Sequence, residues 1–301
     1  MEPYQEKNPR AASLFCGAGG ACLGLRRAGF EVVAGVDFDP LALATYTAAG
    51  GTAIQHTITE EQPLPPEWVG PMTGLDLLWA SPPCQPWSQA GKMKGAEDER
   101  DAWPATAAAV ALLKPRWFVA ENVRGVEEHL DSYVVPALRM MGYVAGWRCL
   151  NAADYGVPQT RQRVILVAGP ERFRWPLATH WDPQRYDCDA AGKMPWRSMG
   201  EALGLPLTSN DSRRPAPSVC AGHGGTGAGQ WSASQETRER IARVTGKPRL
   251  TTTESAILQD FPTDYPWQGG VTAVYRQIGN AVPPTLSRVV AIAIKNSCET
   301  G

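Results

Sequence analysis

The feature that most constrains the fold is an alternation of short apolar runs and helix-like stretches between residues 12 and 168. Such an alternation is typical of a parallel sheet with helices on its faces. The expected strands are residues 12–15, 31–36, 75–80, 117–120 and 164–168. The expected helices between them include residues 21–28, 40–48 and 102–113. The last helix should stop before Pro115, because proline cannot continue it. The pattern therefore predicts an α/β fold.

The periodicity ends near Gly169, and a segment rich in Trp, Pro, Gly, Ser and Arg follows to about Lys247. Turn-forming residues at this density predict a second, smaller and irregular domain. Regular patterns then return, with helices expected over residues 251–258 and 284–294. We therefore expect three parts. They are a domain over residues 1–168, an irregular domain over 169–248, and a segment over 249–301 that returns to the first domain.

Composition excludes several classes of protein. The 301 residues contain no apolar stretch approaching the ~18 residues of a membrane span, and no apolar leader follows Met1. This predicts a cytoplasmic protein that does not contact a membrane. The seven cysteines are odd in number and form no C-x-x-C pair, which argues against a disulfide framework and against a metal site.

Charge is unevenly distributed along the chain. The formal net charge of −1 carries no general signature of nucleic-acid binding. Residues 170–250, however, contain 12 Lys and Arg against 8 Asp and Glu, a local excess of four positive charges. Such an excess suits a polyanionic partner, although surplus arginines equally form solvated surfaces.

A glycine-rich turn, SLFCGAGG at residues 13–20, joins the first expected strand to the first expected helix. Glycines let a backbone approach a ligand closely, as in sites for nucleotide-like cofactors. The dinucleotide fingerprint is not met, because Cys22 stands in place of its third glycine. Asp37 ends the second strand, twenty residues beyond Gly17, where a carboxylate can hold a ribose diol. The alternatives are a tight strand-to-helix connection for the turn and a helix N-cap for Asp37.

Two further polar motifs follow expected strands. In SPPCQPWS, residues 81–88, rigid prolines would present Cys84 at the carboxyl edge of the sheet, either as a nucleophile or as a small buried hydrophobe. In ENVRG, residues 121–125, Glu121 would lie at the same edge. There it is either a proton donor or acceptor, or simply an acidic residue at the start of a helix.

These motifs, in this order and at these spacings, closely resemble those of the C5-cytosine DNA methyltransferase family. Further matching runs are YGVPQTRQR (155–163), LTTTE (250–254), LQDFP (258–262) and QIGNAVPP (277–284). The resemblance covers essentially the whole chain except residues 169–247. It implies a Rossmann-like sheet of the S-adenosylmethionine-dependent methyltransferases with a smaller, irregular target recognition domain.

The resemblance implies an enzyme that flips a cytosine out of duplex DNA and transfers a methyl group from S-adenosylmethionine to carbon 5. The product would be S-adenosylhomocysteine, and no metal is expected. Cys84 would attack C6 while Glu121 protonates N3, so that negative charge does not build up on the ring. Arg163 would hold the cytosine O2, and Arg161 would support the catalytic loop or the DNA backbone. Asn122 would orient Glu121 or the exocyclic amine. The arginines are expected to lower the pKa of the cysteine.

By the same resemblance, the cofactor pocket should combine the glycine turn, the ends of the second and third strands, and the tail. Its residues would be Phe15, Gly17, Ala18, Gly19, Gly20, Asp37, Phe38, Thr57, Ile58, Pro82, Asn280, Ala281 and Val282. Asp37 would bind the ribose and Phe38 would stack on the adenine. There is one departure, because Thr57 stands where the family usually has an Asp that binds the adenine amine.

Contacts to DNA are expected from the catalytic motif, the loop after it and the irregular domain. The candidates are Gln85, Ser88, Lys92, Lys94, Arg213, Arg214, Ser218 and Val219, joined by Arg238, Arg240 and Arg243. Ser218-Val219 resembles a Thr-aliphatic dipeptide of the recognition domain. The alternatives are a solvated loop for residues 89–95 and a flexible linker for 216–227. The expected partner is double-stranded DNA, bound by a monomer, and a cognate restriction endonuclease is a candidate second partner.

Three other functions are weighed. An RNA cytosine methyltransferase of the same fold is disfavoured by the middle segment and by the run Pro86-Trp87-Ser88, but it stays open at this point. A catalytically silent DNA-binding module has no need of Glu121. An NAD-binding oxidoreductase conflicts with the missing third glycine.

Overall fold

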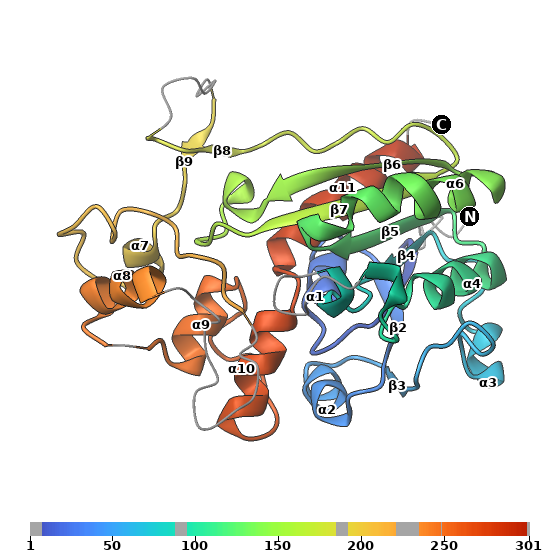
Figure 1. Cartoon of the computed structure of the whole chain (residues 1–301), viewed down its shortest axis with the longest axis horizontal. Coiled ribbons are helices and arrows are strands. Elements are labelled where there is room, and N and C mark those ends of the chain that lie inside the picture. The colour runs from blue at the N-terminus through green and yellow to red at the C-terminus, as the bar shows by residue number, and fades with distance from the viewer. Residues whose placement is uncertain (1–7, 88–94, 185–191, 221–234, 248, 300–301) are drawn as a thin grey trace, which may run out of the picture.

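The computed structural model describes residues 8–87, 95–184, 192–220, 235–247 and 249–299. A seven-stranded sheet with the order β3-β2-β1-β4-β5-β7-β6 forms its centre (Figure 1). The strands are β1 (Arg10–Leu14), β2 (Glu31–Asp37), β3 (Ala53–Gln55), β4 (Leu77–Ala80), β5 (Trp117–Asn122), β6 (Val144–Asn151) and β7 (Gln162–Gly169). All five expected strands are present, and the expected α/β fold is confirmed.

The sheet is mixed rather than wholly parallel. Strands β1 to β5 run parallel to one another, whereas β7 runs antiparallel to both β5 and β6. The expectation of a parallel strand at residues 164–168 is therefore wrong in direction. Only residues 152–161 join β6 to β7. A parallel crossover needs a dozen or more residues, so this connection can only return the chain antiparallel.

Burial explains which strands the sequence pattern predicts. Every residue of β4 and β5 is buried, because helices cover both faces of the parallel part of the sheet. Such strands appear in the sequence as continuous apolar runs. Strand β6 lies at the outer edge and is half exposed, so it lacks this signal and the sequence analysis does not predict it.

Some helices cover the two faces of the sheet, and α7 to α10 form a separate lower lobe. They are α1 (Gly20–Arg27), α2 (Pro40–Ala48), α3 (Pro66–Val69), α4 (Trp103–Leu113), α5 (Glu127–His129), α6 (Val135–Met140), α7 (Met199–Leu203), α8 (Gln235–Thr245), α9 (Thr252–Leu258), α10 (Val271–Asn280) and α11 (Pro284–Glu299). Two short strands, β8 (His180–Trp181) and β9 (Met194–Pro195), form a ribbon of their own. Within the described ranges, no helix has the length and apolar character needed to cross a bilayer.

The last helix lies against the first. Gly24 of α1 has no Cβ, and a Cβ there would overlap the Ser287 hydroxyl and the Pro284 carbonyl of α11. The Ser287 hydroxyl also donates to the carbonyl of Ala21 across a distance of 3.2 Å. The last helix thus packs, together with α1, on one face of the sheet (Figure 1).

A third apolar cluster holds the lobe of α7 to α10 together. Its buried members are Met199, Ala216, Val219, Ile241, Leu250, Ala256, Leu258, Phe261, Tyr265, Val274 and Ile278. They come both from the middle segment and from the helices of the tail. These two parts of the chain therefore share one core beside the sheet (Figure 1).

Candidate active site

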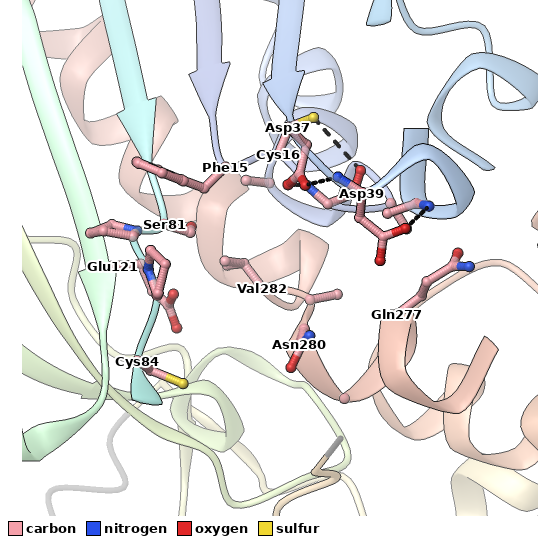
Figure 2. A pocket seen from close by; sticks show the side chains of 18 of the residues that line it. Phe15, Cys16, Asp37, Asp39, Ser81, Cys84, Glu121, Gln277, Asn280 and Val282 are labelled. Atoms are coloured by element: carbon pink, nitrogen blue, oxygen red, sulfur yellow. Dashed lines mark hydrogen bonds between the residues drawn. The ribbon is translucent and has the colours of Figure 1, made fainter. Parts of the chain in front are cut away.

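A cavity of about 570 Å³ lies at the carboxyl ends of the parallel strands (Figure 2). The carboxyl edge is where open α/β sheets bind their ligands. The predicted residues among those that line it are Phe15, Gly17, Ala18, Asp37, Phe38, Pro82, Cys84, Gln85, Glu121, Asn122, Arg161, Arg163, Asn280, Ala281 and Val282. The glycine turn, both catalytic motifs and the tail thus meet in one pocket.

Asp37 links the glycine turn to the end of β2. Its carboxylate accepts hydrogen bonds from the backbone N–H groups of Gly17, at 2.8 Å, and Asp39, at 2.9 Å. Burial raises the pKa of Asp37, while the two backbone donors oppose this rise. The N-cap of α2 is Asp39, whose carboxylate accepts from the N–H groups of Leu41 and Ala42. The alternative interpretation of Asp37 as the N-cap is therefore wrong.

Four residues predicted for the cofactor are not part of the pocket lining. Gly19 and Gly20, at the end of the turn, pack closely against other parts of the protein, because a Cβ there would meet Tyr46 and the Val282 carbonyl respectively. Thr57 is exposed on the loop after β3, and Ile58 packs in the hydrophobic core. These glycines act through packing in the structure, and a contact of Thr57 or Ile58 with the cofactor stays a prediction.

Backbone and side-chain hydrogen bonds hold the turn that carries Cys84. The Asn122 amide donates to the carbonyl of Pro82 at 3.1 Å, and its oxygen accepts from the N–H of Val123 at 2.8 Å. The N–H of Trp87 donates to the carbonyl of Cys84 at 3.1 Å, closing a short 3₁₀ turn. Asn122 thus braces the cysteine turn, and the structure shows no bond from it to Glu121.

The protonation of Cys84 is set mainly by burial. Desolvation raises the pKa of the thiol, and the carboxylate of Glu121 raises it further. Arg163 and Arg161 lower the pKa, but the net shift is upward. The arginines thus lower the pKa as expected, but burial outweighs their charge and the thiol does not titrate below its ordinary range.

Glu121 and Arg163 form an ion pair beside the cysteine. The distance from Arg163 Nε to Glu121 Oε1 is 2.9 Å, and Glu121 is only 7% exposed. Arg163 Nη1 also donates to the backbone carbonyl of Gln162 at 2.7 Å. The pair fixes the direction of the carboxylate, and the remaining guanidinium N–H groups are left for a ligand. Figure 2 shows Glu121 and Cys84 on one side of the pocket and Asp37 on the other.

Arg161 is buried, at 2% exposure, and its guanidinium binds three backbone carbonyls. They belong to Val219, at 2.6 Å, Gly279, at 2.9 Å, and Ala281, at 3.1 Å. Burial, followed by the charge of Arg163, lowers the pKa of Arg161 to about 9, so it is still cationic at neutral pH. This arginine is therefore not part of an exposed strand edge. Arg161 instead joins the lower lobe to the wall of the pocket.

A pair of buried glutamines runs parallel to this contact. Gln159 accepts from the N–H of Val219 at 2.7 Å and donates to the Gln259 side chain at 2.5 Å. Gln259 in turn donates to the carbonyl of Ala281 at 2.6 Å. The same two backbone positions are therefore connected twice, through Arg161 and through the glutamines.

The predicted DNA contacts differ in accessibility. Arg213, Arg214 and Arg238 are exposed, Ser218 is half-buried and Val219 is buried. Arg240 and Arg243 both form ion pairs with Asp211, at 3.2 and 2.9 Å, so they are committed within the protein. Ser88, Lys92, Lys94 and residues 222–227 lie outside the described residues.

One feature of the pocket and one aromatic contact beside the cysteine turn escape the sequence analysis. Arg276 and Asp39 both line it and form an ion pair at 3.0 Å. Arg276 and Asn280 are one helical turn apart on α10, so the helical spacing around the predicted Asn280 could have indicated it. The second feature is His129, whose ring lies 4.5 Å from that of Trp87, directly after the cysteine turn. No sequence motif points to His129, because the contact joins distant parts of the chain.

Solved structures of other proteins have a fold similar to that of this chain. A structure of the Entamoeba histolytica methyltransferase EhMeth has a TM-score of 0.69 at 15% identity and covers 97% of this chain and 99% of its own. A structure of S. pombe Dnmt2 methyltransferase has a TM-score of 0.65 at 20% identity, covering 97% and 99%. These similarities place the fold among the Rossmann-like α/β methyltransferases.

Sequence similarity narrows the class. Type II methyltransferase M.NgoMIV of Neisseria gonorrhoeae is 32% identical over 91% of this chain and 93% of its own. Type II methyltransferase M.NaeI of Lentzea aerocolonigenes is 33% identical over 93% and 73%. The family model of the C-5 cytosine-specific DNA methylases matches residues 10–195 and 208–296. The chain therefore belongs to this family and is an S-adenosylmethionine-dependent DNA cytosine-5 methyltransferase, which excludes the oxidoreductase alternative and favours DNA over RNA.

Proposed function

We propose that Cys84, Glu121 and Arg163 carry the reaction on a cytosine flipped out of duplex DNA. The observation that carries this proposal is the Glu121–Arg163 ion pair in the same cavity as the cysteine. A pyrimidine ring offers N3 and O2 on one edge, and a carboxyl group beside a guanidinium is complementary to these two atoms. The cysteine can then approach C6 from the face of the ring.

Each residue has a defined task in this proposal. The Cys84 thiol gives its proton to the Glu121 carboxylate as the sulfur bonds to C6. The electron pair of the C5–C6 double bond then shifts toward C4 and N3, and Glu121 passes the proton on to N3, which leaves a neutral enamine with its electron density at C5. Arg163 stabilises O2. After methyl transfer, loss of the C5 proton restores the double bond and expels Cys84. The base is extruded from the duplex at a cost of about a few kcal/mol.

The other half of the cavity fits S-adenosylmethionine. Asp37, 8% exposed, offers a carboxylate to a ribose diol, and the ring of Phe38 is 63% exposed for stacking. Gly17 has a φ of +52°, a conformation that favours glycine, and this brings the backbone up to the cavity. When bound, this cofactor supplies an electrophilic methyl group on a sulfonium. Asn280 and Val282 would close the pocket from the tail.

We assign residues 169–248 to target recognition, between a catalytic domain over residues 1–168 and a returning segment over 249–301. The exposed Arg213 and Arg214 support this, because arginine binds phosphates and guanine edges. Relatives named as Type II methyltransferases support a role in restriction and modification beside an endonuclease for the same site. The enzyme would act as a monomer in the cytoplasm, on double-stranded DNA.

The proposal is tested with duplex DNA that contains 5-fluorocytosine at the target position. The fluorine cannot leave as a cation, so the enzyme should stay bound through Cys84 after methyl transfer. Wild type is expected to form a covalent complex that depends on S-adenosylmethionine, visible on a denaturing gel. Cys84→Ser should form none, and Glu121→Gln should form it at least 100-fold more slowly, since a general acid contributes about 10²–10⁴ in rate.

Cys149→Ser is the matched control, because Cys149 is an exposed free cysteine on β6. It should form the complex at the wild-type rate. The assignment of the nucleophile is wrong if Cys84→Ser methylates normally or if wild type gives no covalent complex.

A further inference from the structure

A second cavity, of about 620 Å³, lies at the outer edge of the sheet. Four arginines line it: Arg139 on α6, Arg148 on β6, and Arg172 and Arg174 on the chain that follows β7. We call it the arginine cavity. None of the described residues that line it is an Asp or a Glu. It therefore collects four positive charges in a protein whose net charge is −1.

The arginines are not neutralised within the protein. Across the described ranges, none of the four forms an ion pair. By comparison, Arg240 and Arg243 in the lower lobe both reach Asp211. Like charges gathered around one cavity repel each other. An anion in the cavity would relieve this repulsion.

Local packing holds part of the set in place. The guanidinium of Arg148 lies 5.4 Å from the ring centre of Trp175, and Arg139 donates to the carbonyl of Ala145 at 3.4 Å. Phe173 is buried against Trp117, with ring centres 6.0 Å apart. Because residues alternate in an extended chain, anchoring Phe173 turns its two arginine neighbours outward, and both are exposed.

The cavity is separate from the active pocket. Val167, which lines it from β7, is four residues along the strand from Arg163, or roughly 13 Å at about 3.3 Å per residue. The register continues away from the active edge, since Val144 pairs with Gly169 at the far end of both strands. A ligand in the arginine cavity would thus leave the cysteine free.

We propose that the arginine cavity binds backbone phosphates of a second DNA segment while a cytosine occupies the active pocket. Guanidinium groups bind phosphate oxygens in pairs, without reading sequence. Stacking of unpaired bases is disfavoured, because Arg148 covers Trp175 and the N–H of Trp147 is committed to Asp131 at 2.8 Å. The ligand is therefore duplex DNA held by its phosphates. This inference rests on the proposed function only because its test uses the covalent complex with 5-fluorocytosine DNA to occupy the active pocket.

The test uses the covalent complex with a short duplex containing 5-fluorocytosine, which occupies the active pocket. A second, fluorescent 30-base-pair duplex of A·T pairs, which has no cytosine, is then titrated in and followed by anisotropy. Wild-type complex is expected to bind it with an affinity that falls steeply with salt. The variant R172Q/R174Q should bind at least 10-fold more weakly, with a salt slope smaller by about 1 to 2, since each phosphate contact contributes about 0.9.

The matched control is K114Q/R116Q, which removes two exposed charges of the same spacing outside the cavity. It should keep the wild-type salt slope. Equal slopes for the two double variants, or no second duplex on the wild-type complex, would overturn the proposal. Adding inorganic phosphate at millimolar concentration and constant ionic strength distinguishes a site for small anions from a site for the phosphates of DNA. If it displaces the A·T duplex, the cavity is a small-anion site and the DNA assignment fails. If no covalent complex forms at all, the proposed function has failed instead.

Discussion

At the scale of single residues, the proposed nucleophile, Cys84, rests as a thiol rather than a thiolate. Burial and Glu121 raise the pKa of Cys84, and the two arginines only partly offset them. Because thiolates are the reactive form, a raised pKa lowers the reactivity of the free thiol at neutral pH. The ion pair of Glu121 with Arg163 places opposite charges next to the same sulfur. Removing the charge of Glu121 and removing that of Arg163 should therefore shift the pKa of Cys84 in opposite directions.

This gives a prediction for the free enzyme. Glu121→Gln removes a charge that raises the pKa of Cys84, so its alkylation by iodoacetamide should begin at lower pH than in wild type. Arg163→Gln removes a charge that lowers the pKa, so alkylation should begin at higher pH. The rate at the Cys84 peptide is followed by mass spectrometry across pH 6 to 10, a range of about four units around the usual thiol pKa. Shifts of the same sign in both variants would contradict this electrostatic account.

The residue types of the site are readable from the sequence, but their energetics are not. The motifs predict Cys84 and Glu121 at one sheet edge, and the cavity contains both. The net direction of the pKa shift depends on how deeply the fold buries the thiol, which no motif encodes. The partners of Arg161 are backbone carbonyls far along the chain, and a carbonyl carries no sequence signal.

At the scale of elements, contact between the first and last helices decides whether the tail can form the pocket wall. Gly24 allows α1 and α11 to approach closely. The ion pair of Arg27 with Asp260, at 3.8 Å, is a looser contact from the same helix. Asn280 and Val282, which line the pocket, lie just before α11. Displacing α11 should therefore disturb the pocket as well as the core.

Gly24→Ala tests this contact, because the expected change in stability is opposite in sign to that of the same change in an isolated helix. In an isolated helix the change would stabilise by about 1 kcal/mol. Here the new methyl group overlaps Ser287 and Pro284, so we expect a loss of about 1–3 kcal/mol in the free energy of unfolding, measured with urea. Gly70→Ala is the control, because a Cβ there meets nothing within 4 Å. A Gly24→Ala variant as stable as wild type would show that the two helices can separate without cost.

The elements also show what a sequence pattern can and cannot predict. Helix α2 is found with its expected ends, since Asp39 and Pro40 form a recognisable start. Strand β6 and the antiparallel direction of β7 are not predicted, because the first is half exposed and the second depends on its partner. Helix α10 is not predicted either, although it carries Asn280.

At the scale of the whole molecule, a buried cation and a pair of buried glutamines join the lower lobe to the pocket wall. Arg161 binds the carbonyl of Val219 on one side and those of Gly279 and Ala281 on the other. A guanidinium can hold several carbonyls in fixed directions, whereas an ammonium is a compact point charge. A change at the proposed recognition segment should therefore reach the proposed cofactor pocket through Arg161 and the glutamine pair.

Arg161→Lys should weaken both functions together. We expect a loss of about 2 kcal/mol or more in stability, since buried carbonyls lose their donors, and a weaker affinity for S-adenosylmethionine in the absence of DNA. Thermal unfolding and isothermal titration calorimetry measure the two effects. Arg116→Lys, at an exposed arginine, is the control and should change neither. Normal cofactor affinity in a destabilised Arg161→Lys protein would confine this residue to a structural role.

The apolar cluster that spans α7 to α10 bears on how new sequence specificities arise. Its members come from both sides of residue 248, with Met199 and Ile241 packed together with Leu258 and Ile278. If the proposed recognition segment were exchanged between relatives at residues 169 and 248, the new segment would carry one part of this apolar core and leave the other part behind. The unit of exchange that keeps this interior intact extends through α10. A graft of that size also brings the pocket residues Arg276 and Asn280, so a change of target would be accompanied by a change in part of the proposed cofactor site.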